Sequence, residues 1–224
     1  MKYHFFILTC FFTACLIGQG CSNGKQQTED RVSKQNTAQQ DQSNAQNRSE
    51  KGSHDESYHK KGRTIVKATM GALKGQLGQA IAEGGAPHAI RFCNVHAMSI
   101  TDSMSQAYDV DIARVSDRNR NPKNATSDRE EDIMKDMRGA MEGGQKPKPM
   151  VVETDDKVVY YHPIPINNGL CLNCHGTPGA EINEKTLAAI DERYPNDQAK
   201  GYAMNDLRGL WKIQFAKSEE APTP

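Results

Sequence analysis

The chain has 224 residues, of which 36% are hydrophobic, and its 28 basic residues balance its 28 acidic ones. This length suits one domain of ordinary size with accessory segments. Because the chain carries neither a strong basic nor a strong acidic field, we expect no nucleic-acid partner, and charge alone indicates no class of substrate.

The N-terminus is typical of an export signal over residues 1–20. Lys2 precedes an apolar run of 14 residues from Phe5 to Gly18, which is shorter than the about 20 residues that span a bilayer. Gly18 to Cys21 resembles the end of a bacterial lipoprotein signal, although Gly18 stands where Leu is usual. We therefore expect a periplasmic or cell-envelope protein with membrane attachment through a lipid on Cys21. Ordinary cleavage nearby, without an anchor, is the alternative.

Residues 21–61 are rich in Gln, Asn, Ser and charged side chains. Such a segment buries too little apolar surface to offset its ordering entropy, so we expect a disordered polar tether. The ordered domain is expected over residues 62–217, and residues 218–224 form a C-terminal tail.

Within the ordered part, apolar spacing and turn residues predict the elements in chain order. They are a helix from residue 62 to a stop at Gly84-Gly85, a helix from Pro87 to about Asp109, a strand over 110–115, a polar turn over 117–124, a helix over 130–141, a hairpin of strands 150–153 and 157–162, a helix over 184–193 and a strand over 207–215. This order predicts an α+β domain with an antiparallel sheet.

The sequence Cys171-Leu172-Asn173-Cys174-His175 is the attachment motif of haem c. Two thiols separated by two residues can form thioether bonds to the two vinyl groups of one porphyrin, and the next residue then projects toward the iron. We expect one covalent haem held by Cys171 and Cys174, with His175 as an iron ligand. The export signal supports this, because c-type haem is assembled outside the cytoplasm.

Two other interpretations of the motif are weaker. A thioredoxin-like redox pair would need a strand-to-helix start that the surrounding sequence lacks. A zinc site would need two more ligands, and the chain has no second Cys-x-x-Cys pair.

The ligand on the other side of the iron stays open when spacing alone is considered. Cys93, His96, His88, His162 and a methionine are candidates. Cys93 has no disulfide partner once the motif cysteines bind haem, but a buried free cysteine is also a common packing residue. A thiolate ligand would lower the reduction potential, whereas methionine would raise it.

Several segments, taken in order, resemble a family of single-haem c-type proteins with a PAS-like fold and iron bound by His and Cys. Relatives in this family form sensor domains of bacterial signalling proteins. The matching segments are residues 89–93 (AIRFC), 118–122 (RNRNP), 160–164 (YYHPI), 171–176 (CLNCHG), 194–202 (YPNDQAKGY) and 206–209 (DLRG).

The resemblance implies Cys93 as the distal ligand, His175 as the proximal one, and a PAS-like antiparallel sheet flanked by helices. An arginine pairs well with carboxylates, so Arg118 or Arg120 is a candidate to hold a haem propionate, and we favour Arg120. Tyr160 and Tyr161 alternate faces of their strand, so at most one faces the haem, and Tyr161 is the one we expect.

With both axial positions filled, substrate cannot reach the iron unless a ligand leaves, so we expect no enzyme activity, and a peroxidase-type haem enzyme is the least favoured of three functions. An electron-transfer cytochrome is favoured, working with an unknown redox or signalling protein. A haem-based redox or gas sensor acting through a separate partner is the alternative, because fold alone does not decide function.

Overall fold

The computed structural model describes residues 26–217. The predicted export signal, the lipid site at Cys21 and the C-terminal tail lie outside these residues. The chain divides after Glu50 into two units, and everything below concerns the second. Along the described stretch, no helix is both long and apolar enough to cross a membrane.

The second unit is an α+β domain built on a four-stranded antiparallel sheet, as the sequence predicts, with strand order β1-β4-β3-β2. Helix α3, which carries the Cys-x-x-Cys-His motif, was not indicated by the spacing of apolar residues. The elements are α1 (Gln26–Tyr108), β1 (Asp111–Val115), the short 3-10 helix η1 (Pro122–Asn124), α2 (Asp128–Glu142), β2 (Met150–Glu153), β3 (Lys157–Pro165), α3 (Gly169–His175), α4 (Glu184–Arg193) and β4 (Leu207–Ala216).

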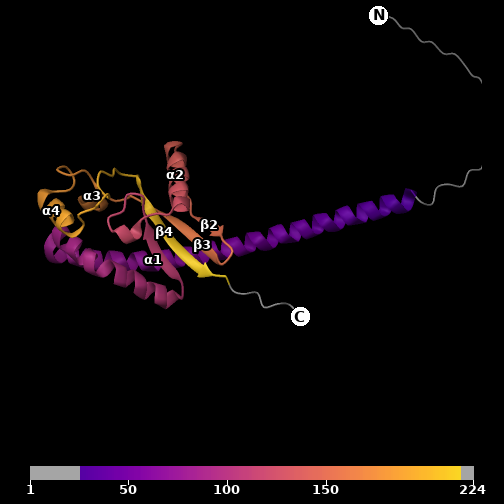
Figure 1. The fold of residues 1–224 in the computed structure, drawn as a ribbon, viewed down its shortest axis with the longest axis horizontal. Helices are drawn as coiled ribbons and strands as arrows, with labels where there is room; N and C mark the ends of the chain where they lie inside the picture. The colour runs from indigo at the N-terminus through magenta and orange to yellow at the C-terminus, as the bar shows by residue number, and fades with distance from the viewer. Residues whose placement is uncertain (1–25, 218–224) are drawn as a thin grey trace, which may run out of the picture. The chain divides into compact units, whose positions relative to one another are not determined.

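Helix α1 contains a sharp kink where the sequence predicts a stop. Gly84 and Gly85 leave helical geometry, and Gly85 has a φ of 70°, which glycine adopts without steric cost. Figure 1 shows the later part of α1 turning back along the earlier part. The kink therefore lets one continuous segment supply two helices to the domain.

The structure differs from the predicted tether at its C-terminal end, because α1 is already helical before Gly62. The Tyr58 ring lies 5.0 Å from that of Phe215, and the His59 ring lies 5.6 Å from that of Tyr160. Tyr58 continues the helical spacing of Gly62 and Ile65, so it reaches the same core. A single aromatic residue in a polar stretch was too weak a signal to predict that the helix and the core begin before Gly62.

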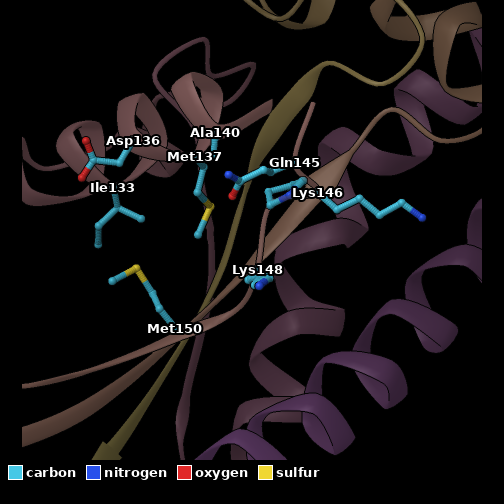
Figure 2. A pocket seen from close by; sticks show the side chains of 9 residues that line it. Ile133, Asp136, Met137, Ala140, Gln145, Lys146, Lys148 and Met150 are labelled. Atoms are coloured by element: carbon cyan, nitrogen blue, oxygen red, sulfur yellow. The ribbon is translucent and has the colours of Figure 1, made fainter. Parts of the chain in front are cut away.

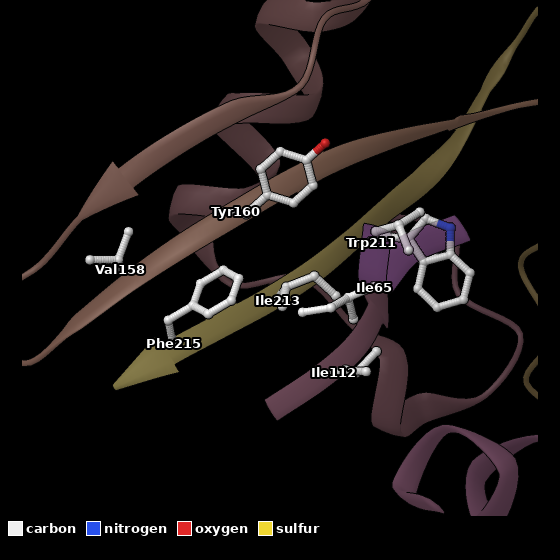
Figure 3. Close-up of a cluster of buried hydrophobic side chains, with 8 residues drawn as sticks. Ile65, Ile112, Val158, Tyr160, Trp211, Ile213 and Phe215 are labelled. Carbon is white, nitrogen blue, oxygen red and sulfur yellow. The ribbon is translucent and has the colours of Figure 1, made fainter. Parts of the chain in front are cut away.

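Helix α1 covers one face of the sheet. Figure 3 shows Ile65 of α1 beside Trp211 and Ile213 of β4. Gly62 lies directly on the buried Tyr160, since a Cβ at this position would clash with the ring. The buried members of this cluster are Ile65, Val66, Ile112, Val158, Tyr160, Trp211, Ile213 and Phe215.

Helix α2 covers the opposite face through Ile133, Met134 and Met137. A pocket of about 230 Å³ lies where this helix meets the chain before β2. In Figure 2, Ile133 and Met137 of α2 face Met150 across it. None of the Cys, His or Arg residues of the candidate site lines this pocket.

Helices α3 and α4 lie together at one end of the sheet, near the kink of α1 (Figure 1). Ile90 of α1 and Ile190 and Tyr194 at the end of α4 form a small core with Cys174. This core brings the part of α1 that carries Cys93 to the motif helix.

Candidate functional site

The two motif cysteines are carried by the seven-residue helix α3. Asn168 caps its start, because the Asn168 side chain accepts a hydrogen bond of 2.9 Å from the backbone N–H of Leu170. Cys171 and Cys174 are three residues apart, so they share a helix side, and both are free thiols. A Cβ at Gly176 would lie 2.8 Å from the Leu172 carbonyl oxygen, so only glycine fits after His175.

The orientation of His175 is set by the loop before β4. Nδ1 of His175 lies 2.9 Å from the backbone carbonyl oxygen of Ala199, and the His175 carbonyl accepts a hydrogen bond of 2.9 Å from the N–H of Tyr202. A carbonyl oxygen only accepts, so in this contact Nδ1 carries the proton. The other ring nitrogen, Nε2, then has a free lone pair and can bind a metal.

Arg120 and Asp197 form a bidentate ion pair beside this loop. Nε and Nη2 of Arg120 lie 3.0 Å and 3.1 Å from the two carboxylate oxygens. Nη2 also donates to the carbonyls of Cys174, at 2.6 Å, and Ala199, at 3.3 Å. Nε and Nη2 of Arg120 thus have partners within the chain, and the propionate contact expected from the sequence stays a prediction.

A second set of contacts surrounds Tyr202. The guanidinium of Arg118 stacks 4.2 Å from the centre of its ring and donates to the Lys200 carbonyl. Arg208 lies 5.4 Å from the same ring and donates to Ser116 Oγ at 2.8 Å. The Tyr202 hydroxyl is buried without a hydrogen-bond partner among the described residues.

Cys93 stands on α1 one helical turn after Ile90, and Ile90 packs with Cys174 in the small core at the end of α4. Burial raises the pKa of the Cys93 thiol, while the charges of Arg114 and Arg120 act in the opposite direction. Burial also raises the pKa of Cys174, again against the charge of Arg120. The structure therefore places Cys93 and the motif in one half-buried, cationic environment.

The imidazole of His175 is kept neutral. Burial lowers its pKa well below the usual range, and the charges of Arg208 and Arg120 lower it further, whereas the hydrogen bond to Ala199 acts in the opposite direction. A neutral imidazole is the form that binds metals.

The other histidines considered as ligands have partners outside the motif. His96 is exposed on α1 and its ring packs 4.6 Å from that of Phe92. His88 lies 3.5 Å from a carboxylate oxygen of Glu83, and His162 contacts the hydroxyl of Tyr160 at 3.0 Å. None of these three contacts involves a residue of the Cys-x-x-Cys-His motif.

Tyr161 does not take the place expected from the sequence. It packs under α2 with Met134 and Met137, and its hydroxyl lies 3.4 Å from a carboxylate oxygen of Glu130. Burial raises the pKa of Tyr161 to about 12, with a further contribution from Glu130. The alternation of faces in β3 is as predicted, but this residue faces α2 and not the motif.

Several residues of the site had no role in the sequence interpretation, namely Asp197, Ala199, Tyr202, Arg114 and Arg208. All of them except Arg114 could have been identified from the sequence, because they belong to the stretches that carry the family resemblance. Nothing in the sequence pointed to a role for Arg114, since it stands as one of the polar residues in a strand where apolar and polar residues alternate. Burial lowers the pKa of both Arg114 and Arg208, and no Asp or Glu of the described chain forms an ion pair with either.

Comparison with known proteins gives a family and a structural neighbour. The model of the Tll0287-like family matches residues 25–216. The crystal structure of the cyanobacterial haem protein Tll0287 is similar to this chain with a TM-score of 0.55 and 20% sequence identity, covering 74% of this chain and 98% of that one. No curated protein matches.

Proposed function

Because this chain belongs to the Tll0287-like family, we propose that it is a monohaem c-type cytochrome that transfers electrons at the cell envelope. The observation that carries the proposal is the juxtaposition of two free thiols on α3 with a neutral His175 whose Nδ1 faces the Ala199 carbonyl. The structural neighbour is itself a haem protein.

The chemistry of these donors fits haem c. Cys171 and Cys174 would bind the porphyrin covalently, and His175 would ligate the iron through Nε2. Hydrogen bonding of the second ring nitrogen to a carbonyl is the usual support for a metal-bound histidine. The four-stranded antiparallel sheet with helices on its faces is consistent with a PAS-like fold.

Cys93 is the proposed second axial ligand, because it stands one helical turn after Ile90, which packs with Cys174 of the motif. A thiolate ligand lowers the reduction potential of a haem iron. With Cys93 and His175 both bound, no position would remain for a substrate, so we propose an electron carrier and not an enzyme.

Two guanidiniums fit the carboxylates of the cofactor better than Arg120 does. Arg114 and Arg208 are half-buried cations whose pKa values burial lowers, and a cation partly withdrawn from water is stabilised when an opposite charge pairs with it. The two propionates of one haem would supply two such charges.

The proposed location is the periplasmic side of the envelope, with a lipid on Cys21 as the anchor and a separate redox protein as the partner. The export signal and the residues before Cys21 carry this part of the proposal.

A potential titration followed by optical spectra, with and without carbon monoxide, tests the function. An electron carrier should show a reversible one-electron transition at negative potential and no spectral change with carbon monoxide. Binding of carbon monoxide to the reduced protein with loss of Cys93 ligation would instead indicate a sensor. Rapid turnover of peroxide would contradict the proposal.

A further inference from the structure

We propose that the Arg120–Asp197 ion pair is a positioning device that holds His175 in the tautomer required for iron ligation. The inference deepens the proposed function and rests on it for the role of His175. The contacts that carry it lie within the chain.

The tautomer of His175 depends on the backbone carbonyl of Ala199. The Ala199 oxygen lies 2.9 Å from Nδ1 and requires a proton there. Ala199 stands in the loop between α4 and β4, outside any helix or strand. Something besides regular secondary structure must therefore hold this carbonyl in place.

The ion pair binds both the backbone N–H and the backbone carbonyl of Ala199. Oδ1 of Asp197 accepts a hydrogen bond of 2.9 Å from the Ala199 N–H, and the same oxygen lies 3.0 Å from Arg120 Nε. Nη2 of Arg120 donates to the Ala199 carbonyl and to the carbonyl of Cys174, the residue before the histidine. The Arg120 guanidinium thus connects the loop that carries Ala199 to the C-terminal end of α3, next to His175.

Burial makes this connection rigid. The Asp197 side chain is 0% exposed and that of Arg120 is 11% exposed. The planar fork of arginine can serve the carboxylate and two carbonyls together, which the single ammonium of lysine cannot reproduce.

Arg208 is a second hydrogen-bond donor near His175, and it favours the other tautomer. Nε of Arg208 lies 3.4 Å from the same Nδ1 of His175. A guanidinium only donates, so a good hydrogen bond from Arg208 would need an unprotonated Nδ1. The proton would then be on Nε2, which blocks ligation. The Ala199 carbonyl and Arg208 therefore favour opposite tautomers, and the ion pair decides between them.

The test uses the full-length haem-containing protein with Arg120→Lys, which keeps the charge. We expect covalent haem to be retained, the single low-spin ferric signal in paramagnetic resonance to split into two or more species, and the reduction potential to rise. The potential rises because a weaker hydrogen bond at Nδ1 makes the imidazole a poorer electron donor to the iron. Arg138→Lys is the matched control, since Arg138 pairs with Asp117 away from the Ala199 loop, and it should change neither readout.

The spectrum and the potential separate positioning from general damage. An Arg120→Lys protein that unfolds more easily but keeps the original spectrum and potential would overturn the inference. Asp197→Asn, which keeps the size of the side chain, provides a second variant if Arg120→Lys does not accumulate, and an unchanged spectrum there would equally overturn it.

Nitrogen-15 chemical shifts of His175 in the full chain made without haem attachment distinguish this inference from the proposed function. The unaltered chain should show the Nδ1–H tautomer, and Arg120→Lys should show a mixture. If the unaltered chain proves to bind no haem, the proposed function fails, while the tautomer shift still decides the role of the ion pair. The same tautomer in both proteins would overturn the positioning role.

Discussion

Lys212 of β4 reaches the buried Glu130 of α2, with Nζ 2.7 Å from Oε1. Glu130 also accepts a hydrogen bond of 2.8 Å from the backbone N–H of Ser127, which completes a capping box at the start of α2. One carboxylate therefore joins the helix cap to the sheet. These two contacts explain why the charged Glu130 is buried on the side of α2 that faces the sheet.

Glu130→Gln should destabilise the domain by about 2 kcal/mol, somewhat below the range for a fully buried pair because Lys212 is partly exposed. Glutamine can still serve in the capping box, so the change isolates the charge. Chemical denaturation measures the free energy of unfolding, with the exposed Asp132→Asn as the control. Equal stabilities of Glu130→Gln and the unaltered protein would contradict a stabilising ion pair.

The same pair predicts a dependence on pH. Burial by itself raises the pKa of Glu130, but the hydrogen bonds from Lys212 and Ser127 outweigh it and lower the pKa below its usual value. A lowered folded-state pKa stabilises the protein above the unfolded-state pKa of about 4.3, and this contribution is lost as pH falls through the folded value. The stability difference between the unaltered protein and Glu130→Gln should shrink below about pH 4. A difference that stays constant from about pH 7 to about pH 3 would refute this.

Two glycines of α1 should respond to alanine in opposite directions. Gly62→Ala places a methyl group against the buried Tyr160 ring and should cost about 1–3 kcal/mol through overpacking. A Cβ at Gly75 would meet no neighbouring side chain within 4 Å, so Gly75→Ala should stabilise the protein by about 0.5–1 kcal/mol through helix propensity. Thermal unfolding of both variants measures this. A stabilising Gly62→Ala would mean that α1 does not pack on Tyr160 as described.

Cys93→Ala should remove the thiolate signature from the absorption and paramagnetic resonance spectra of the haem protein, because the second axial ligand is lost. The reduction potential should rise, and carbon monoxide should gain access to the reduced iron. His96→Ala is the control, since the exposed His96 ring packs on Phe92 and its loss should leave the spectra unchanged. Unchanged spectra in Cys93→Ala would exclude it as the ligand.

Covalent attachment predicts that the denatured protein keeps its haem. Replacing both Cys171 and Cys174 with alanine should abolish this retention, because no thioether bond can form. The haem content of the unfolded chain after solvent extraction is the measurement, and a protein with Cys93→Ala should retain its haem under the same conditions. Loss of all haem from the denatured unaltered chain would show that the cofactor is not c-type.

The sequence alone determined the elements whose signals are local. The apolar periods and the turn residues predicted most of the helices, the strands and the interruption at Gly84-Gly85, because each reflects the conformational preference of a few neighbouring residues. The motif from Cys171 to His175 likewise depends on spacing within five residues. Its helix was missed because the capping by Asn168 depends on one side chain and not on a period.

Only the tertiary structure decided which residues surround the motif. Arg120 and Asp197 are 77 residues apart and meet as a buried ion pair, which no spacing in the sequence indicated. Tyr161 went to α2 because the register of β3 and the packing of α2 select the face that it occupies. Such pairings depend on how distant segments fold together, so no local pattern in the sequence encodes them.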